Sequence, residues 1–534
     1  MIPCNTTAAR AARKGCGPWN RKKAGNMTST YKKKLIEVAI PLEAINVASA
    51  REKSIRHGHP STLHLWWARR PLAACRAVLF AQLVDDPSSL PEQFPTAELQ
   101  DVERKRLFAI IEELVIWENS TNEEVLERAR AEIRRSCGGV LPPVYDPFSG
   151  GGSIPLEAQR LGLPAYGSDL NPVAVMIGKA LIEIPGKFKN TPPIHPGIND
   201  RSFYRNAEGL AEDVKYYSEW MRGQAWDRIG HLYPRVNLPR DIGGGTATVI
   251  AWIWSRTIPS PDPAYSGTHV PIASSFMLST KTKNEAWVEP IVSREERAIT
   301  YRVRMGGTKE EIARAKEGTK AGRGANFRCL FSGTAITPEY VKSKARAGEI
   351  SHAMIAIVAE GRGKRIFLAP DETHIKIADF ERPSPKFDLL IAQHPQYIGV
   401  MGYGFKNFSE LYTSRQLTTL ETLTELTKDA AQKIQEDIPC QDFEDSISLN
   451  EGGRGRKAYA QAISFYIGLA IDRVAMSGNS LVRWNPVGPK AQHLFGVTAH
   501  PTPTNGYPNN AFRVASSTDR PVSFAVLPID LKAA

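Results

Sequence analysis

The sequence predicts an α/β fold, in which a parallel sheet follows an N-terminal helical lobe and is interrupted by an inserted region of mixed structure. Apolar residues recur at helical spacing over residues 31–136. Between 139 and 185, short apolar runs closed by Gly, Asp and Pro are typical of alternating strands and helices. From 191 to 384, Gly- and Pro-rich joints separate mixed segments, as expected for an insertion.

Composition excludes several classes of protein. With 42% hydrophobic and 23% charged residues in 534, the chain is neither disordered nor fibrous, and its length suits two to four domains. The longest apolar runs fall far short of the roughly 20 residues that cross a bilayer, so we expect no membrane partner. Six cysteines without paired spacing favour a reducing compartment, and hence a cytoplasmic protein.

Charge favours a polyanionic partner. The net charge is +12, and six Lys and Arg residues without any Asp or Glu lie in residues 1–26. We expect residues 1–30 to form a basic, disordered tail. Met27 precedes an amphipathic segment beginning at Tyr31, so Met1 and Met27 are alternative sites for the start of translation.

Three helices are predicted in the lobe over 31–136. Pro71 can be the first residue of one helix, because Leu72, Cys75, Leu79 and Leu83 follow at three- and four-residue spacing. A second is predicted around 107–117 and a charged third around 122–135. Further helices are predicted at 414–434 and 457–476, and a strand at 246–254.

A Gly-rich turn carries the strongest functional signal. Residues 144–158 predict a strand ending at Asp146, three glycines in a tight turn, and a helix starting near Ile154 whose positive N-terminus faces a ligand. A second short strand, 164–168, ends at Asp169, whose carboxylate can accept both hydroxyls of a ribose. The pattern predicts a nucleotide cradle, and the missing third glycine disfavours a dinucleotide site.

A second motif lies upstream, at residues 56–72. It contains His57, His59 and His64, but no Cys or acid stands among them at ligand spacing, which disfavours a zinc site. The other interpretation is a cationic, aromatic segment that leads into the helix after Pro71.

Residues 146–152 resemble the S-adenosylmethionine site of amino-group DNA methyltransferases, whose motif is Asp-Pro-Phe-x-Gly-x-Gly. Beyond this motif, the chain resembles large prokaryotic adenine-specific DNA methylases that begin with a domain of unknown function. That resemblance rests on residues 35–38, 50–54, 64–71, 168–174 and 403–417. It implies a Rossmann-like S-adenosylmethionine-dependent methyltransferase sheet, DNA as partner, and adenine-N6 methylation in modification or phage defence.

The resemblance also implies a set of cofactor-binding residues. Asp146 and the glycines would hold the methionine moiety, Asp169 would bind the ribose, and the 56–72 motif would close over the methionine end. The implied set is Asp146, Pro147, Phe148, Gly150, Gly152, Asp169, Asn171, His59, Arg70 and Pro71.

The chain departs from the family at the catalytic tetrad. The family uses Asp-Pro-Pro-Tyr or Asn-Pro-Pro-Tyr, and this sequence contains neither. Two near matches occur at 262–265 and 394–397, and only the second follows a predicted buried strand, at 387–391. Its residues His394, Pro395 and Tyr397 are the candidate catalytic residues, since neutral His can accept a hydrogen bond. An ordinary Pro-containing turn is the alternative for both.

Two further departures concern the inserted region and the end of the chain. The insertion lacks the paired cysteines of the family's zinc ribbon, so we expect no metal site. Its basic stretch, 309–328, suits phosphate contacts or a solvated loop. After Gly496 the pattern is lost, which is typical of a truncation or a frameshift, and in that case we expect a separate polypeptide to supply the missing catalytic segment.

These observations predict six regions: a tail (1–30), the helical lobe (31–136), the cofactor-binding core (137–190), the insertion (191–384), a returning methyltransferase and helical segment (385–496), and an irregular tail (497–534). The leading hypothesis is a DNA adenine-N6 methyltransferase, inactive alone if truncated. The alternative is a non-catalytic nucleic-acid-binding protein on a methyltransferase-like scaffold. Methylation of RNA or protein with the same cofactor is a third interpretation.

Overall fold

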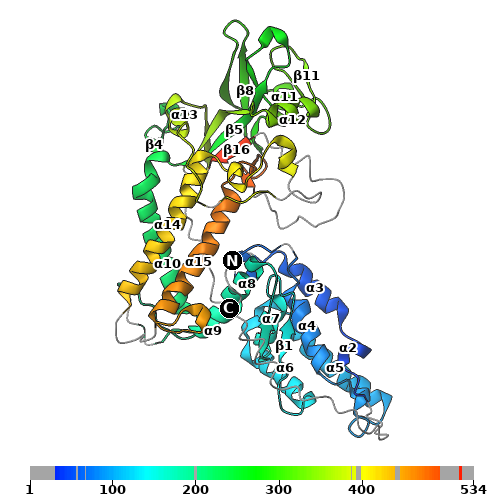
Figure 1. Cartoon of the computed structure of the whole chain (residues 1–534). Coiled ribbons are helices and arrows are strands. Elements are labelled where there is room, and N and C mark those ends of the chain that lie inside the picture. The colour runs from blue at the N-terminus through cyan, green and yellow to red at the C-terminus, as the bar shows by residue number, and fades with distance from the viewer. Residues whose placement is uncertain are drawn as a thin grey trace. The chain divides into compact units, whose positions relative to one another are not determined.

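The protein has a mixed α/β structure, determined as a computed structural model (Figure 1). The structure describes residues 31–55, 58–66, 68–197, 201, 203–361, 363–386, 388–391, 399–438 and 446–492, and the backbone of 516–519. The chain divides into two compact units. The helical unit comprises 31–50, 72–143 and 160–164, and the mixed unit comprises the other described residues. Within the described parts, no helix is long and apolar enough to span a bilayer.

The helical unit confirms the helices predicted for the N-terminal lobe. Its helices are α2 (Leu35–Val38), α3 (Leu42–Glu52, whose last two residues belong to the mixed unit), α4 (Leu72–Leu83), α5 (Ala97–Leu114) and α6 (Glu123–Ser136). Helix α4 starts directly after Pro71, and its Leu72 and Phe80 are fully buried. Helix α5 begins about ten residues earlier than expected, because Thr96 caps it by accepting the Leu99 amide hydrogen bond at 3.3 Å.

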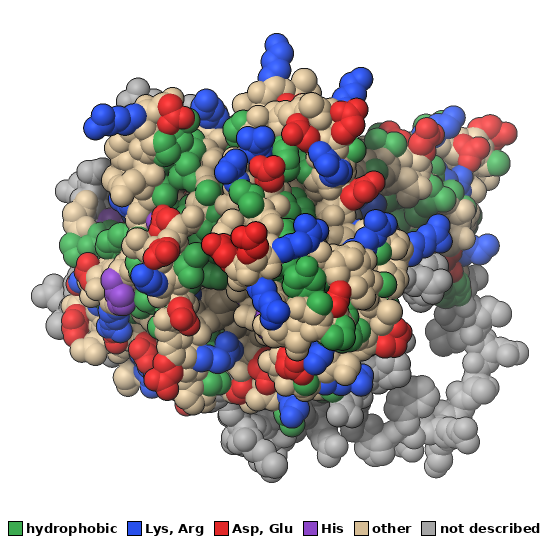
Figure 2. Space-filling view, turned by 90° about the horizontal axis from the view of Figure 1, so that it is seen from above, with side chains coloured by type: hydrophobic (Ala, Val, Ile, Leu, Met, Phe, Trp, Pro, Cys, Tyr) green, Lys and Arg blue, Asp and Glu red, His purple; other side chains and the backbone are tan. Residues whose placement is uncertain are grey.

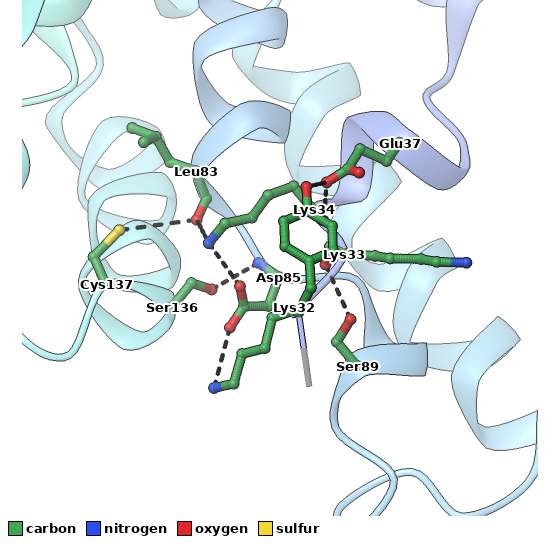
Figure 3. A network of polar contacts seen from close by, with 10 residues as sticks. Lys32, Lys33, Lys34, Glu37, Leu83, Asp85, Ser89, Ser136 and Cys137 are labelled. Carbon is green, nitrogen blue, oxygen red and sulfur yellow. Dashed lines mark hydrogen bonds and ion pairs between the residues drawn. The ribbon is translucent and has the colours of Figure 1, made fainter. Parts of the chain in front are cut away.

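A buried carboxylate joins three segments of the helical unit (Figure 3). Asp85 forms an ion pair with Lys34, with 2.6 Å between Nζ and Oδ1, and lies 3.7 Å from Lys32 Nζ. The same Lys34 ammonium donates to the Leu83 carbonyl at 2.9 Å, and the Asp85 amide donates to Ser136 Oγ at 3.0 Å. The start of the described chain is thereby tied to the ends of α4 and α6.

The mixed unit begins with the predicted strand–turn–helix elements. Strand β1 (Val144–Asp146) runs parallel to β2 (Ala165–Gly167), and α7 (Ser153–Arg160), α8 (Pro172–Gly178), the π-helical η5 (Lys179–Glu183) and α9 (Ile184–Lys187) accompany them. The resemblance implies a larger, Rossmann-like sheet at this place. Among the described residues, β1 and β2 form a sheet of two strands only. Residues 51–71 belong to the same unit rather than to the helical unit, unlike the predicted division at 136.

The strand expected at 387–391 is not formed by the described residues 388–391. These make a single antiparallel bridge, from Leu390 to Asn407, and Leu389 and Leu390 are 71% and 77% exposed. The Asp388 carboxylate explains this path, because it accepts hydrogen bonds from Ser409 Oγ at 2.6 Å and from the Asn407 amide group at 2.9 Å. The segment is thereby held against the short helix η10 (Phe408–Leu411).

Three long helices form the largest hydrophobic core of the mixed unit. They are α10 (Glu208–Ile229), α14 (Ser414–Asp437) and α15 (Arg456–Ser477), and they lie side by side (Figure 1). Fully buried Tyr217, Leu426 and Ile463 come from one helix each. The helices predicted at 414–434 and 457–476 are confirmed, whereas α10 comes from the predicted insertion and still joins this core.

A buried acid holds an irregular segment against this core. The Asp213 carboxylate on α10 accepts hydrogen bonds from the amides of Ile194 and His195 at 3.0 Å and from the Tyr459 hydroxyl at 2.7 Å. Burial raises the pKa of Asp213 to about 6.

The rest of the mixed unit is mainly antiparallel. One sheet has the order β13 (Arg365–Leu368), β12 (Ser351–Glu360), β5 (Val249–Pro259), β16 (Ser516–Asp519), with β6 (His269–Pro271) also paired to β5. A second contains β7 (Met277–Lys281), β8 (Asn284–Ser293) and β9 (Ala298–Met305). Short pairs are β3 (Val236–Asn237) with β4 (Thr246–Ala247), β10 (Phe327–Arg328) with β11 (Ala335–Ile336), and β14 (Arg483–Asn485) with β15 (Lys490–Gln492). Helices α11 (Lys309–Glu317), α12 (Pro338–Arg346) and α13 (Glu372–Ala378) complete it.

One prediction about this region is confirmed, and the structure adds a strand where an irregular tail was expected. The strand predicted at 246–254 is confirmed as β4 and β5, and β5 continues to Pro259. Four residues of the expected irregular tail, 516–519, form β16 beside β5 (Figure 1).

The raised pKa of Asp213 predicts how stability depends on pH. Between about pH 4 and 6 the Asp213 carboxyl is ionised in the unfolded chain and still protonated in the folded chain. The free energy of unfolding therefore falls as pH rises through this range, and the contribution of Asp213 to this fall is at most about 3 kcal/mol. Relative to the parent, Asp213→Asn should therefore gain stability as pH rises from about 4 to 7, measured by urea unfolding. Asp429→Asn, which removes a carboxylate from an exposed ion pair with Arg228, is the control. Parallel pH profiles for the parent and Asp213→Asn would contradict this assignment.

Candidate functional site

The Gly-rich loop starts from an Asp-Pro turn at the end of β1. The Asp146 carboxylate accepts the Phe148 amide hydrogen bond at 3.0 Å, which fixes the direction of the chain after the strand. The Ser168 amide donates to the Asp146 carbonyl at 2.9 Å, and the Ser149 amide donates to the Ser168 carbonyl at 3.0 Å. The loop is thus fastened to the end of β2, at the carboxyl ends of the two parallel strands.

Two glycines give the loop its tight path. Gly150 and Gly152 have φ angles of +49° and +74°, a left-handed conformation that glycine adopts at little cost. The Gly152 amide donates to the Ser149 carbonyl at 2.7 Å, and α7 begins at the next residue. The N-terminus of α7 therefore follows the loop directly, and the helix dipole makes this end electropositive.

Asp169 joins this loop to the segment after β2. One carboxylate oxygen accepts the Gly150 amide hydrogen bond at 2.8 Å, and the other accepts that of Asn171 at 2.9 Å. These hydrogen bonds, first that of Asn171, hold the pKa of Asp169 below its usual value, so the group is anionic at neutral pH. Asn171 in turn caps α8 by accepting the Val173 amide hydrogen bond at 2.9 Å.

The upstream motif packs directly on the glycines. The Arg69 guanidinium donates to the Gly151 carbonyl and, at 3.4 Å, to the His64 carbonyl. Burial lowers the pKa of Arg69 to about 10, which leaves it a cation at neutral pH. A Cβ atom on Gly150 would lie 2.7 Å from the indole nitrogen of Trp66, so no larger residue fits there without displacement.

Arg70 also connects the upstream motif to the Gly-rich loop, through its backbone carbonyl. Its carbonyl accepts a hydrogen bond from Ser153 Oγ at 2.9 Å, which links the upstream motif to the first residue of α7. Pro71 is the last residue of this segment in the mixed unit.

His59 and His64 have structural partners. His59 caps the short helix η2 (Pro60–Thr62) by accepting the Ser61 amide hydrogen bond at 3.2 Å, and its Nε2 lies 3.9 Å from a carboxylate oxygen of Glu52. His64 Nε2 lies 3.4 Å from an Asp472 carboxylate oxygen on α15. Across the described segments, no three His, Cys, Asp or Glu side chains come together as a metal site would require.

Exposed apolar side chains accompany the loop. Tyr145 on β1 stands directly opposite Tyr166 on β2, and both are more than 60% exposed. Phe148 is 85% exposed, and Leu170 is fully exposed. These four side chains belong to β1, β2 and the turns that follow the two strands.

The structure brings most of the predicted cofactor residues together. Asp146, Phe148, Gly150, Gly152, Asp169 and Asn171 share the two turns after β1 and β2, Pro147 lies within the first turn, and Arg70 joins them through its carbonyl. His59 instead caps its own helix. Sequence reasoning did not assign Trp66 and Arg69 to the site, although the aromatic and cationic residues before Pro71 were the available signal.

The two near matches to the catalytic tetrad have different outcomes. His394, Pro395 and Tyr397 lie outside the described residues. In the other match, Asp262 accepts the Ala264 amide hydrogen bond at 2.9 Å and caps the short helix η8 (Pro263–Tyr265), and Tyr265 stacks on Phe331 with ring centroids 4.9 Å apart. Residues 262–265 therefore form an ordinary Pro-containing turn, which was the alternative interpretation of this near match.

Basic residues of the inserted region are mixed with acids. Helix α11 carries Glu310, Glu311 and Glu317 among its Lys and Arg residues, and Lys320 lies over the Phe327 ring, 5.0 Å from its centroid. On the face seen in Figure 2, blue and red side chains alternate over the described surface. That face shows no single broad patch of one sign among its described residues.

Comparison with known proteins gives one match. Residues 39–110 match the family model described as a protein of unknown function, DUF1156, and this range covers all of α3 and α4 and most of α5. No curated protein and no solved structure matches the chain.

The contact between Gly150 and Trp66 predicts a measurable loss of stability. Gly150→Ala should lower the free energy of unfolding by about 1–2 kcal/mol for the left-handed backbone, and by about 1–3 kcal/mol more for the clash with the indole. Gly267→Ala is the matched control, because Gly267 has a φ of +79° with open space around it. Thermal unfolding measures both variants. Equal losses, or no recovery when Trp66→Leu is added to Gly150→Ala, would contradict the contact.

Proposed function

We propose that this protein is an S-adenosylmethionine-dependent DNA methyltransferase, specific for adenine N6 and acting in modification or phage defence. The observation that supports this most is the loop from Asp146 to Gly152, which Asp169 anchors through the Gly150 amide and Arg69 through the Gly151 carbonyl. The methylases that the chain resembles begin with a domain of unknown function, and residues 39–110, near the start of this chain, match a family of unknown function.

The residues at the loop suit this cofactor in charge and hydrogen bonding. Arg69 Nε is buried and has no hydrogen-bond partner among the described residues, so the guanidinium retains a donor for the cofactor's carboxylate. Asp169 uses one lone pair of each oxygen on backbone amides, which leaves acceptor capacity for ribose hydroxyls. Asp146 supplies a carboxylate for the ammonium group. The bound cofactor would supply an electrophilic methyl group on its sulfonium.

The exposed residues around β1 support a larger, Rossmann-like sheet. In the described structure β1 pairs only with β2, and its other edge is open next to exposed Tyr145. Leu389 and Leu390 are also exposed, although their sequence is that of a buried strand. In our proposal, residues 388–391 add to β1 as a parallel strand when substrate binds. The candidate residues His394, Pro395 and Tyr397 would follow the carboxyl end of that strand, where ligands bind in such sheets.

Partners and location belong to the same proposal. DNA is the substrate, and a separate polypeptide that carries the missing Asp-Pro-Pro-Tyr is the partner if the chain binds cofactor without transferring methyl groups. Cys75, Cys137 and Cys329 are free thiols in the described structure, which supports a reducing, cytoplasmic location. The absence of the tetrad from the sequence favours a non-catalytic nucleic-acid-binding scaffold as the second candidate.

Calorimetric titration with S-adenosylmethionine is the direct test. Asp146→Ala should weaken binding about tenfold or more, because it removes a charged hydrogen-bond acceptor and the turn at Phe148. Asp262→Ala should bind as the parent does, since Asp262 makes the same kind of Asp-Pro turn away from the loop. Absence of binding by the parent, or equal binding by Asp146→Ala, would overturn the proposal. Methyl transfer to genomic DNA then separates a complete enzyme from a cofactor-binding scaffold.

The proposed strand addition is tested by chemical cross-linking. A short bismaleimide should join Tyr145→Cys to Leu389→Cys within the full chain when cofactor and DNA are present, because neighbouring strands place residues about 5 Å apart. Tyr145→Cys alone controls for reaction with the native cysteines, and mass spectrometry identifies the linked peptides. A yield that matches this control would exclude the addition of residues 388–391 to β1.

A further inference from the structure

A cavity of about 310 Å³ lies in the antiparallel part of the mixed unit, and no residue of the candidate cofactor site lines it. Strands β5, β7 and β12, the turn before β7, and the hairpin formed by β14 and β15 surround it. Apolar side chains, among them Ile253, Phe276 and Ile355, form part of its wall. This volume is at the lower end of the range for small-ligand pockets, at roughly 300–1,000 Å³.

The hairpin is fixed in place and presents its polar side chains together. Trp484 is buried, and its indole nitrogen donates to the Leu278 carbonyl on β7 at 2.7 Å. Arg483 and Gln492 stand opposite each other in register, and Arg483 Nε donates to Gln492 Oε1 at 2.6 Å. Alternation along the strand places Asn485 on the same face as Arg483, and all three polar residues line the cavity.

Within the described residues, the groups of this polar face that lack a hydrogen-bond partner are donors. Gln492 uses its amide oxygen on Arg483, and Asn485 uses its own on the Val487 amide at 3.0 Å. The remaining groups are the two terminal nitrogens of Arg483 and the two amide NH₂ groups. Among the described residues that line the cavity, none is acidic. The site therefore suits a ligand that presents acceptors at one edge.

We propose that this cavity binds a single unpaired nucleobase of the DNA strand, with guanine preferred. A guanine offers the O6 and N7 acceptors that an Arg fork binds in pairs, and its flat rings suit the apolar wall. A phosphate group would satisfy the donors but not the wall formed by Ile253, Phe276 and Ile355. The inference deepens the proposed function, since it rests on DNA as the substrate and assigns a specificity-determining site to the hairpin.

Fluorescence anisotropy of the full chain, without cofactor, tests the base preference. The probes are short fluorescein-labelled thymidine oligonucleotides that carry one central guanine, adenine, cytosine or thymine. The guanine probe should bind about tenfold more tightly than the all-thymine probe, because a paired Arg contact discriminates between bases by about that factor. Since every probe has the same phosphates, a difference in affinity reports on the base.

Two variants identify the residue responsible. Arg483→Lys keeps the charge but removes the paired donors, so it should abolish the guanine preference and leave binding of the all-thymine probe within about twofold. Lys490→Gln is the control, because Lys490 is an exposed cation of the same hairpin that does not line the cavity. It should weaken all probes alike and keep the preference. Circular dichroism checks that both variants fold.

Several outcomes would overturn the inference. Equal affinity of the parent for all four probes would do so, and so would a guanine preference that survives Arg483→Lys. Saturable binding of free dGMP without binding of any oligonucleotide would assign the cavity to a free nucleotide instead of a DNA strand. Cofactor plays no part in this assay, so a chain that fails to bind S-adenosylmethionine can still show the base preference, and failure of one proposal is distinguishable from failure of the other.

Discussion

The hydrogen bonds that Asp169 accepts from Gly150 and Asn171 are the constraint on which the candidate cofactor site depends. One carboxylate closes the Gly-rich turn after β1 and also sets the start of α8 through Asn171. Both contacts use backbone amides, which favours the anionic form of the carboxyl group. The residue proposed to bind the ribose is therefore also the one that shapes the loop, so its replacement would alter loop structure whether or not it alters binding.

Buried charged groups hold irregular segments at three places, each time by contacts with backbone groups. Arg69 donates to the carbonyl of Gly151, Asp213 accepts from the amides of Ile194 and His195, and the Asp85 network ties the first described residues to the helical unit. A charge withdrawn from water is stable only where hydrogen bonds compensate the loss of hydration. These contacts therefore select one path for chain that regular secondary structure does not fix, and they make that path sensitive to single substitutions.

The two proposed sites divide recognition between the two kinds of sheet in the mixed unit. The parallel pair β1 and β2 presents anionic and backbone groups that suit a nucleoside carrying an amino acid, whereas the β14–β15 hairpin presents donors that suit a base. The open edge of β1 and the exposed Leu389 and Leu390 add a conformational element, because apolar surface of this kind is stabilised by burial on assembly. Cofactor binding, base selection and strand addition can therefore be examined as separate steps.

Local sequence determined the elements whose pattern is complete within a short stretch. Apolar periodicity predicted α4, α6, α14 and α15, and the strand, glycine and acid order predicted the turn from Asp146 into α7 and the acid at Asp169. The remaining residues of the candidate site were implied by the resemblance to DNA methylases and not by the pattern. Tertiary structure alone decided that Trp66 and Arg69 contact the glycines and that α10 joins the core of α14 and α15. It also decided that residues 388–391 do not form a strand, because Asp388 binds Ser409. The physical reason is that these outcomes depend on contacts between residues far apart in the chain, which leave no periodic signal in either partner.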